Sequence, residues 1–275
     1  MPKLPRSVIA AIPHYNMPDT LKRLLGQVLS QGYSQVYVLD DNSKNCRIED
    51  IIKPFGKAVK LISGKQNVGA GSNRNRILEA PASELRGAIL HFIDADCTLV
   101  TKDIPATARR LFADNPVLGA VGGLILNANG SKYPSNFSPH MSRLYGLATR
   151  IQRAIAAIAT HSPKRARRLR RAFQFFLTGW PDITEPAQAR DVFCLAEANF
   201  FIPYDTFAKI SGFDSTLRYH EAQDLARSLE RLSLIRRFDP AVVVKHHAVQ
   251  VRTNRLAEKA QGFKHLVQKY GLPLW

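Results

Sequence analysis

Apolar and polar positions along the first half of the chain follow two patterns in alternation. Short apolar runs rich in β-branched residues predict buried strands, and apolar residues that recur every three to four positions predict amphipathic helices. The first pattern predicts strands at residues 7–12, 36–39, 58–62, 88–93 and 117–126, and the second predicts helices at 21–29, 70–79 and 103–113. This alternation indicates an α/β fold with a mostly parallel sheet flanked by helices.

The second half contains the pattern of two consecutive amphipathic helices. Ser138-Pro139 and Ser162-Pro163 both have the capping serine and first-turn proline that begin many helices. Apolar residues at helical spacing follow the first pair, and the strongly basic run 164–171 follows the second. We therefore expect an inserted basic helical hairpin over residues 139–177. The remaining predicted elements are a strand at 192–202, a helix from about 204, a helix at 221–232 and a strand at 241–244.

Composition narrows the class of protein. The chain has 275 residues, 45% of them hydrophobic, which suffices for a large buried core and excludes intrinsic disorder. It contains neither an apolar run of about 18 residues nor the pattern of a signal peptide, and its three widely spaced cysteines predict neither a disulfide framework nor a zinc site. We therefore expect a cytoplasmic protein. The net charge of +17 predicts an anionic partner, which leaves nucleotide phosphate, nucleic acid and an acidic lipid surface open.

Two carboxylates directly follow the most apolar predicted strand. Asp94 and Asp96 flank Ala95 at the end of the sequence LHFI, where burying two acidic groups is costly without a cation. Hard divalent ions take oxygen ligands and usually share their coordination with substrate phosphates. The pair therefore favours a site for a metal ion and a diphosphate. The alternative is that the two aspartates only cap the turn after the strand.

Polar residues also follow the other predicted strands, at the sheet edge where α/β folds bind ligands. Asp41 lies in the turn Asp-Asp-Asn-Ser after the second strand, where it can bond a nucleobase or ribose or can form only an Asx turn. Residues 67–75 contain two glycines and enter a helix, which puts Arg74 within reach of a base or a phosphate. This segment has neither the Walker A sequence nor the GxGxxG spacing, so those two classes of nucleotide site are disfavoured.

These motifs, in this order, resemble those of the family 2 glycosyltransferases with the GT-A fold. The resemblance covers the opening VVIPxYN at 8–16, the VDDxS turn at 38–43, NxGxxxxRN at 67–75, the DxD strand at 92–96, the stretch ending in GGFD at 199–214, the ED motif at 221–225 and a late strand ending in histidine at 242–247. It implies a single GT-A domain over residues 1–275. Within it, 1–130 would bind the nucleotide-sugar, 131–190 would form the helical insertion, and 191–275 would bind the acceptor and carry catalysis.

The resemblance also implies individual roles. It assigns the donor nucleotide-sugar, a UDP-sugar as first choice, to Pro13, Asn16, Asp41, Asn67, Arg74 and Asp94. Asp96 would be the main ligand of a Mn²⁺ or Mg²⁺ ion. A histidine at the end of the late strand would be a further ligand, and we favour His246 over His247 because it comes first and because strand side chains alternate.

The catalytic base of the implied inverting reaction depends on how the ED motif is aligned. If Asp224 is the base, Gln223 stands where the family has glutamate. The other register matches Glu221 but leaves Ala222 at the position of the base. We therefore favour Asp224. Glu221 lies on the same helical face, where it either assists or is only a solvated charge at the helix start.

The resemblance thus implies metal-dependent, inverting transfer of a sugar to the hydroxyl of a glycan or lipid-linked acceptor, in surface polysaccharide or glycolipid synthesis. An alternative is a nucleic-acid-binding protein, or a sugar transferase acting on nucleic acid, that uses residues 164–171. Single-strand grooves normally interleave aromatic and basic residues over an open sheet, whereas here they follow one another on a helix. The run better fits an element that meets an anionic membrane, with the protein peripheral at its inner face.

Overall fold

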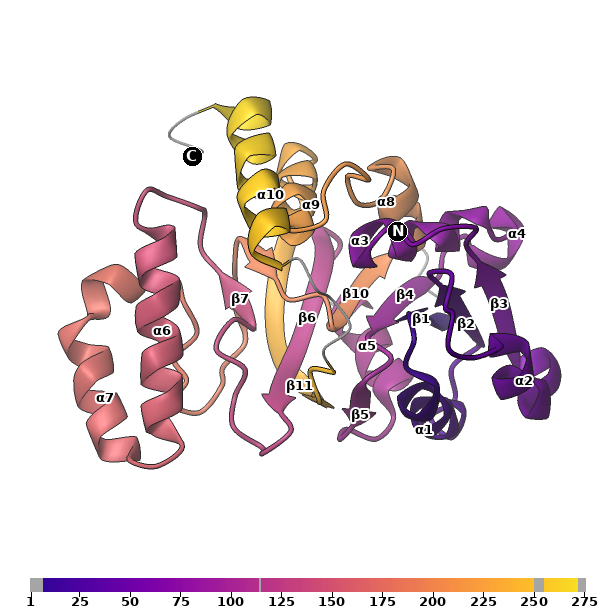
Figure 1. Ribbon diagram of the computed structural model, residues 1–275, viewed down its shortest axis with the longest axis horizontal. Coiled ribbons are helices and arrows are strands. Elements are labelled where there is room, and N and C mark those ends of the chain that lie inside the picture. Colours follow the sequence, from indigo (N-terminus) through magenta and orange to yellow (C-terminus); the bar gives the residue numbers. More distant parts are fainter. Residues whose placement is uncertain (1–6, 114, 250–254, 272–275) are drawn as a thin grey trace.

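The computed structural model describes residues 7–113, 115–249 and 255–271. Its centre is a nine-stranded sheet with helices on both faces, in the strand order β3-β2-β1-β4-β10-β6-β11-β5, and β8 also pairs with β11 (Figure 1). The predicted α/β fold is confirmed.

The first half of the sheet is parallel throughout. It consists of β1 (Val8–His14), β2 (Gln35–Asp40), β3 (Val59–Ser63) and β4 (Ile89–Ile93). All residues of β1 and β4 are buried, because helices cover both faces of the sheet there. The helices of this half are α1 (Pro18–Leu29), α2 (Ile48–Ile52), α3 (Ala70–Arg74), α4 (Ala82–Leu85) and α5 (Ile104–Ala113), with the 3₁₀ turns η1 (Lys53–Ala58) and η2 (Asn75–Glu79).

The second half of the sheet is mixed. Strand β10 (Asn199–Pro203) lies antiparallel between β4 and β6 (Leu118–Asn127), and β11 (Ile235–His246) runs parallel to β6. The short strands β5 (Cys97–Leu99) and β8 (Arg190–Asp191) pair antiparallel with β11, and a separate two-stranded sheet joins β7 (Phe137–Ser138) to β9 (Cys194–Leu195). Strand β11 is longer than the predicted 241–244, because a register shift between Phe238 and Val243 lets it continue past Pro240.

The predicted helical hairpin is present and lies at one end of the molecule, on the left of Figure 1. It consists of α6 (Tyr145–Ala159) and α7 (Pro163–Ala172), followed by the 3₁₀ turn η3 (Gln174–Leu177). The start of α7 agrees with the prediction. The expected start of α6 at Ser138-Pro139 is wrong, because Ser138 belongs to β7 and pairs with Cys194.

Three helices complete the fold around β10 and β11. They are α8 (Tyr204–Lys209), α9 (Glu221–Arg231) and α10 (Arg255–Tyr270), of which the sequence pattern predicted only the first two. Helix α10 is fastened through Lys269, whose Nζ lies 2.7 Å from Asp214 Oδ2 and 2.8 Å from Asp224 Oδ1. The hydroxyl of Tyr270 also donates to Asp224 Oδ1 at 2.5 Å. These contacts hold α10 against the start of α9 and the turn before it.

Candidate active site

A cavity of about 350 Å³ opens beside the carboxyl ends of β1, β2 and β4. This is the edge at which α/β sheets bind their ligands. The cavity is lined by Pro13, His14, Tyr15, Met17, Asp41, Asn67, Gly69, Ala70, Asn73, Asp94, Asp96, Arg218, His246, Ala248, Val249 and Glu258. Four of the six residues predicted to bind the donor, Pro13, Asp41, Asn67 and Asp94, are among them, as are both predicted metal ligands.

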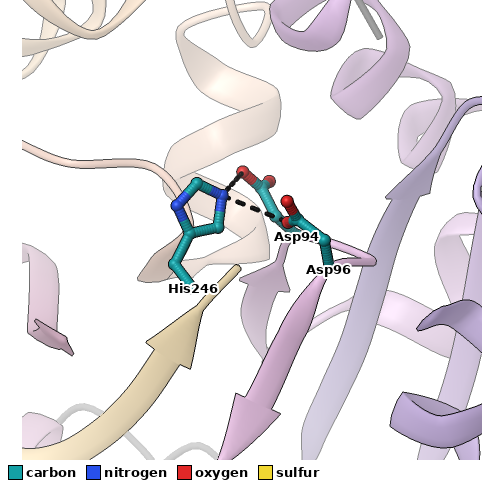
Figure 2. A group of neighbouring side chains, drawn as sticks. All are labelled: Asp94, Asp96 and His246. Carbon is teal, nitrogen blue, oxygen red and sulfur yellow. Dashed lines mark ion pairs between the residues drawn. The ribbon is translucent and has the colours of Figure 1, made fainter. Parts of the chain in front are cut away.

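Asp94, Asp96 and His246 form one group in the wall of this cavity (Figure 2). Their ligand atoms all lie within 4.8 Å of one another, and His246 Nε2 is 3.1 Å from Asp96 Oδ1 and 3.9 Å from Asp94 Oδ2. The group forms because His246 ends β11 in register with Cys97, the residue after Asp96. Two carboxylates and an imidazole are a donor set that suits Mn²⁺.

The neighbouring His247 points to a different partner. Its Nε2 lies 2.8 Å from Thr98 Oγ1, whereas His246 Nε2 faces the two aspartates. This difference follows from the alternation of side chains along a strand. Of the two histidines, the structure therefore brings His246 to the aspartates, while its role as a metal ligand stays a prediction.

The charges of Asp94 and Asp96 favour a proton on His246. Burial by itself lowers the pKa of His246, but the hydrogen bond to Asp96 and the charges of both aspartates raise that pKa above its ordinary value. Burial raises the pKa of Asp96, but the bond to His246 and the N–H of Val249, 2.7 Å from Oδ2, together hold that pKa below its usual range. A cation that binds His246 must displace this proton.

We expect the affinity for Mn²⁺ to rise with pH for this reason. The pKa of His246 is raised above 6.5, so its proton competes with the metal at every pH below that raised pKa. One competing proton gives up to about tenfold in affinity per pH unit, and the slope vanishes above the raised pKa. Calorimetric titration with Mn²⁺ between pH 5.5 and 8.5 measures it. His246→Gln, which cannot titrate, serves as the comparison; an unchanged slope in this variant would remove His246 from the site.

Arg74 bonds Asp94, one of the three residues of the group formed by Asp94, Asp96 and His246. Its guanidinium is buried and donates from Nη2 to Asp94 Oδ1 at 2.5 Å and from Nη1 to Glu197 Oε2 at 2.8 Å. Burial lowers the pKa of Arg74, but the charges of Asp94, Glu197 and Glu221 more than offset this and raise it. Arg74 was expected to reach a base or phosphate directly. In the structure Arg74 does not line the cavity, and its hydrogen bond to Asp94 orients that carboxylate.

Asp41 and Asn16 hold the loops that form the cavity. The two carboxylate oxygens of Asp41 accept the N–H groups of Val68 and Gly69, each at 2.9 Å. Gly69 has φ +92°, which a side chain would strain, so glycine permits the turn that Asp41 stabilises. The side-chain oxygen of Asn16 accepts the N–H of Lys44 at 2.8 Å. Asn16 does not line the cavity and instead ties the loop after β1 to the turn after β2.

Glu221 and Asp224, the predicted catalytic carboxylates, lie in the first turn of α9 and are both buried. Neither lines the cavity. Asp224 faces Lys269 and Tyr270 on α10. Glu221 packs against Gly71, where an added Cβ would lie 2.7 Å from Glu221 Cγ, and its charge acts on Arg74. Of the two carboxylates, Glu221 is therefore the one that lies near Arg74, which bonds Asp94 in the cavity wall.

Sequence reasoning missed three charged residues at this site. Glu197 is 123 positions from its partner Arg74, and Arg218 donates to the carbonyl of Asn67, 151 positions away, at 2.9 Å. Arg218 Nη1 also lies 3.8 Å from Glu258 Oε1 on α10. Arg218 adds a positive charge to the cavity wall. Glu197 stands two residues before the motif recognised at 199–214, which was the one available signal.

Comparison with protein families places residues 9–173 in the family described as Glycosyl transferase family 2. The match covers more than half of the chain. The chain belongs to this family. The matched region includes Asp94, Asp96 and Arg74 but ends before α9 and β11.

The fold of the chain is similar to that of several solved structures. A crystal structure of GalNAc-T7 with UDP, GalNAc and Mn²⁺ matches with a TM-score of 0.68 at 14% identity, over 98% of this chain and 49% of that one. The mannosyltransferase PcManGT from Pyrobaculum calidifontis, in complex with GDP-Man and Mn²⁺, matches with 0.57 at 16% identity, over 96% and 65%. TarS 1–349 of S. aureus matches with 0.53 at 17% identity, over 88% and 60%. The chain thus spans half to two thirds of these proteins.

No protein of curated function matches the chain significantly. Within the described residues, no helix has both the length and the apolar character required to cross a bilayer.

Proposed function

We propose that this family 2 glycosyltransferase binds a nucleotide-sugar in the cavity at the sheet edge through a Mn²⁺ or Mg²⁺ ion, and that it transfers the sugar to a hydroxyl acceptor with inversion. The observation that carries the proposal is the group Asp94, Asp96 and His246 in the cavity wall. Complexes of GalNAc-T7 with UDP and Mn²⁺ and of PcManGT with GDP-Man and Mn²⁺ support it. We propose a UDP-sugar as the first donor to test.

The residues around the cavity have distinct tasks in this proposal. Asp96 and His246 would hold the cation, whose charge would stabilise the departing diphosphate. Arg74 keeps Asp94 in position for the ribose and the diphosphate, and Arg218 adds positive charge at the cavity wall. The loop at residues 67–69, fixed by Asp41, forms the nucleoside side together with Pro13. Groups that are held in position by such contacts reduce the reorganisation required during transfer.

For catalysis we propose that the carboxylates of α9 act on the acceptor, with Glu221 as the general base and Asp224 as its neighbour. The alignment of the ED motif favoured Asp224, but the Oδ1 atom of Asp224 is bonded by Lys269 and Tyr270. A general base removes the proton of the acceptor hydroxyl as the oxygen attacks the anomeric carbon, while the bond to the diphosphate breaks on the opposite face. Such a base contributes about 10²–10⁴-fold to the rate.

We expect Glu221→Gln to retain Mn²⁺-dependent donor binding and to lower sugar transfer by about 10²-fold or more. Asp224→Asn is expected to reduce activity less, and to resemble Lys269→Met, which removes the partner of Asp224 without changing the carboxylate. Initial rates and donor affinity are measured for all three variants. A normally folded Asp224→Asn that loses about 10²-fold, beside an active Glu221→Gln, would return the role of base to Asp224.

We further propose that the acceptor is a glycan or a lipid-linked glycan, and that the enzyme works in surface polysaccharide or glycolipid synthesis at the cytoplasmic face of a membrane. The basic hairpin supports this placement, because it presents positive charge at one end of the molecule (Figure 1). The test is incubation with labelled UDP-sugars and a membrane lipid extract, followed by proton NMR of the product. A labelled lipid or glycan with inverted anomeric configuration is the expected result. Labelled nucleic acid, or retained configuration, would contradict the proposal.

A further inference from the structure

The helical hairpin concentrates exposed apolar side chains. Leu144 and Leu147 near the start of α6 are each 46% exposed, Phe173 after α7 is 38% exposed, and Phe175 in η3 is 80% exposed. A groove of about 190 Å³ lies between Leu144 and Phe175. Apolar side chains gathered on one projecting element mark an interaction surface more strongly than the same residues scattered singly.

All lysine, arginine, aspartate and glutamate positions in the same segment are basic. Residues 139–181 contain no aspartate or glutamate, and their nine basic residues are Arg143, Arg150, Arg153, Lys164, Arg165, Arg167, Arg168, Arg170 and Arg171. An element with this composition fits an anionic partner and repels a cationic one.

Two of these arginines serve the fold. Arg167 Nε lies 2.8 Å from Glu185 Oε1, and Arg170 lies 3.7 Å from Asp182 and donates to the carbonyls of Leu177 and Trp180. These contacts hold η3 and the following loop against α7.

Four basic residues on α7 remain for a partner. Lys164, Arg165, Arg168 and Arg171 are exposed and form no ion pair with a described residue. Three of them, Lys164, Arg168 and Arg171, lie at intervals of four and three positions and share one face of the helix, opposite the buried Ala166.

We infer that the hairpin docks on an anionic lipid bilayer through the exposed apolar side chains Leu144, Leu147, Phe173 and Phe175 and the basic groups Lys164, Arg168 and Arg171. We call this set the docking face. Its aromatic and leucine side chains enter the boundary between head groups and acyl chains, while its basic groups bind the phosphates. This inference adds a defined surface to the membrane location in the proposed function. It is independent of the chemistry of the cavity, because it requires neither metal nor nucleotide.

Vesicle sedimentation tests the docking face directly. The wild-type protein at low salt is expected to sediment with phosphatidylcholine vesicles that contain 30% phosphatidylglycerol, and to bind vesicles of pure phosphatidylcholine much less. Removing three basic groups, in Lys164→Gln/Arg168→Gln/Arg171→Gln, is expected to weaken binding about 100-fold, since each contributes roughly fivefold. Phe175→Asp is expected to weaken it about tenfold or more.

Matched variants elsewhere on the surface serve as controls. Lys22→Gln/Lys57→Gln/Arg110→Gln removes the same charge from exposed positions, and Val117→Asp changes another exposed apolar residue. Both are expected to bind vesicles as the wild type does. Equal losses in the test and control variants would show that only net charge matters and would overturn the docking face, as would wild-type protein that ignores anionic vesicles.

A parallel titration with a single-stranded 20-mer oligonucleotide separates lipid from nucleic acid. Oligonucleotide binding that the triple α7 variant loses, in protein that does not bind vesicles, would also overturn the inference. Mn²⁺-dependent nucleotide binding is measured on the same variants and is expected to be unchanged. A failure of the docking face is therefore distinguishable from a failure of the proposed glycosyl transfer.

Discussion

We expect Asp96→Asn to abolish Mn²⁺-dependent nucleotide binding and to lower sugar transfer by about 10³-fold or more, with little change in fold. A metal ion supplies several kcal/mol of charge stabilisation to a departing diphosphate, and about 1.4 kcal/mol corresponds to tenfold in rate. Asparagine has the shape of aspartate and keeps an oxygen for the N–H of Val249. What it loses is the negative charge that faces His246.

Asp50→Asn is the matched control, because Asp50 is exposed and lies outside the cavity. Nucleotide titrations with Mn²⁺ and with EDTA, circular dichroism and initial rates are compared for the two variants and the wild type. An Asp96→Asn protein that still binds nucleotide in a Mn²⁺-dependent way would exclude Asp96 as a ligand. An unfolded variant would assign Asp96 to stability instead.

The second large effect concerns the stability of the donor half. We expect Arg74→Met to lower the free energy of unfolding by about 3 kcal/mol or more, since it leaves two carboxylates without their buried partner. Asp94 and Glu197 both bond this guanidinium, and methionine occupies a similar volume without charge. Urea denaturation at pH 7 measures the loss.

A double-mutant cycle distinguishes this explanation from a simple packing defect. Removing one stranded charge, in Arg74→Met/Glu197→Gln, is expected to recover part of the lost stability. Arg110→Met, at an exposed helical position, is expected to change the free energy of unfolding by less than about 0.5 kcal/mol. If Arg74→Met is as stable as the wild type, or the double variant is worse than the single one, the buried pairing does not stabilise the fold.

The hydrophobic pattern was sufficient to predict a strand where both faces of that strand are buried. Strands β1 and β4 read as continuous apolar runs because helices cover them on both sides. The pattern failed where tertiary contacts determine the element. Strand β11 passes through Pro240 with a register shift, and its first part contains the charged residues Arg236, Arg237 and Asp239, so only residues 241–244 resembled a strand. The start of α6 was predicted wrongly because Ser138 belongs to a short strand and pairs with Cys194, 56 positions away.

The candidate site divides in the same way. Asp94 and Asp96 could be predicted because they directly follow a buried strand, and His246 because the resemblance to family 2 glycosyltransferases implies a histidine at the end of the late strand. The surroundings of Arg74 could not, since Glu197 reaches it only through the pairing of β10 with β4. The environment of Asp224 depends on α10, a helix whose contact with α9 has no signal in the sequence around either residue. The alignment of the ED motif therefore favoured Asp224 without any information on this environment.

The most direct test of the central claim, that this cavity holds a nucleoside diphosphate through a divalent cation, is a thermal-shift panel on the wild-type protein. UDP, dTDP, GDP and CMP are each added with Mn²⁺ and, separately, with EDTA. A ligand that binds only the folded protein at about 100 times its dissociation constant adds ~2.7 kcal/mol of stability, which shifts the melting temperature measurably. We predict such a shift for a nucleoside diphosphate, UDP first, with Mn²⁺ and little or none in EDTA. No shift with any nucleotide, or equal shifts with Mn²⁺ and EDTA, would contradict the account.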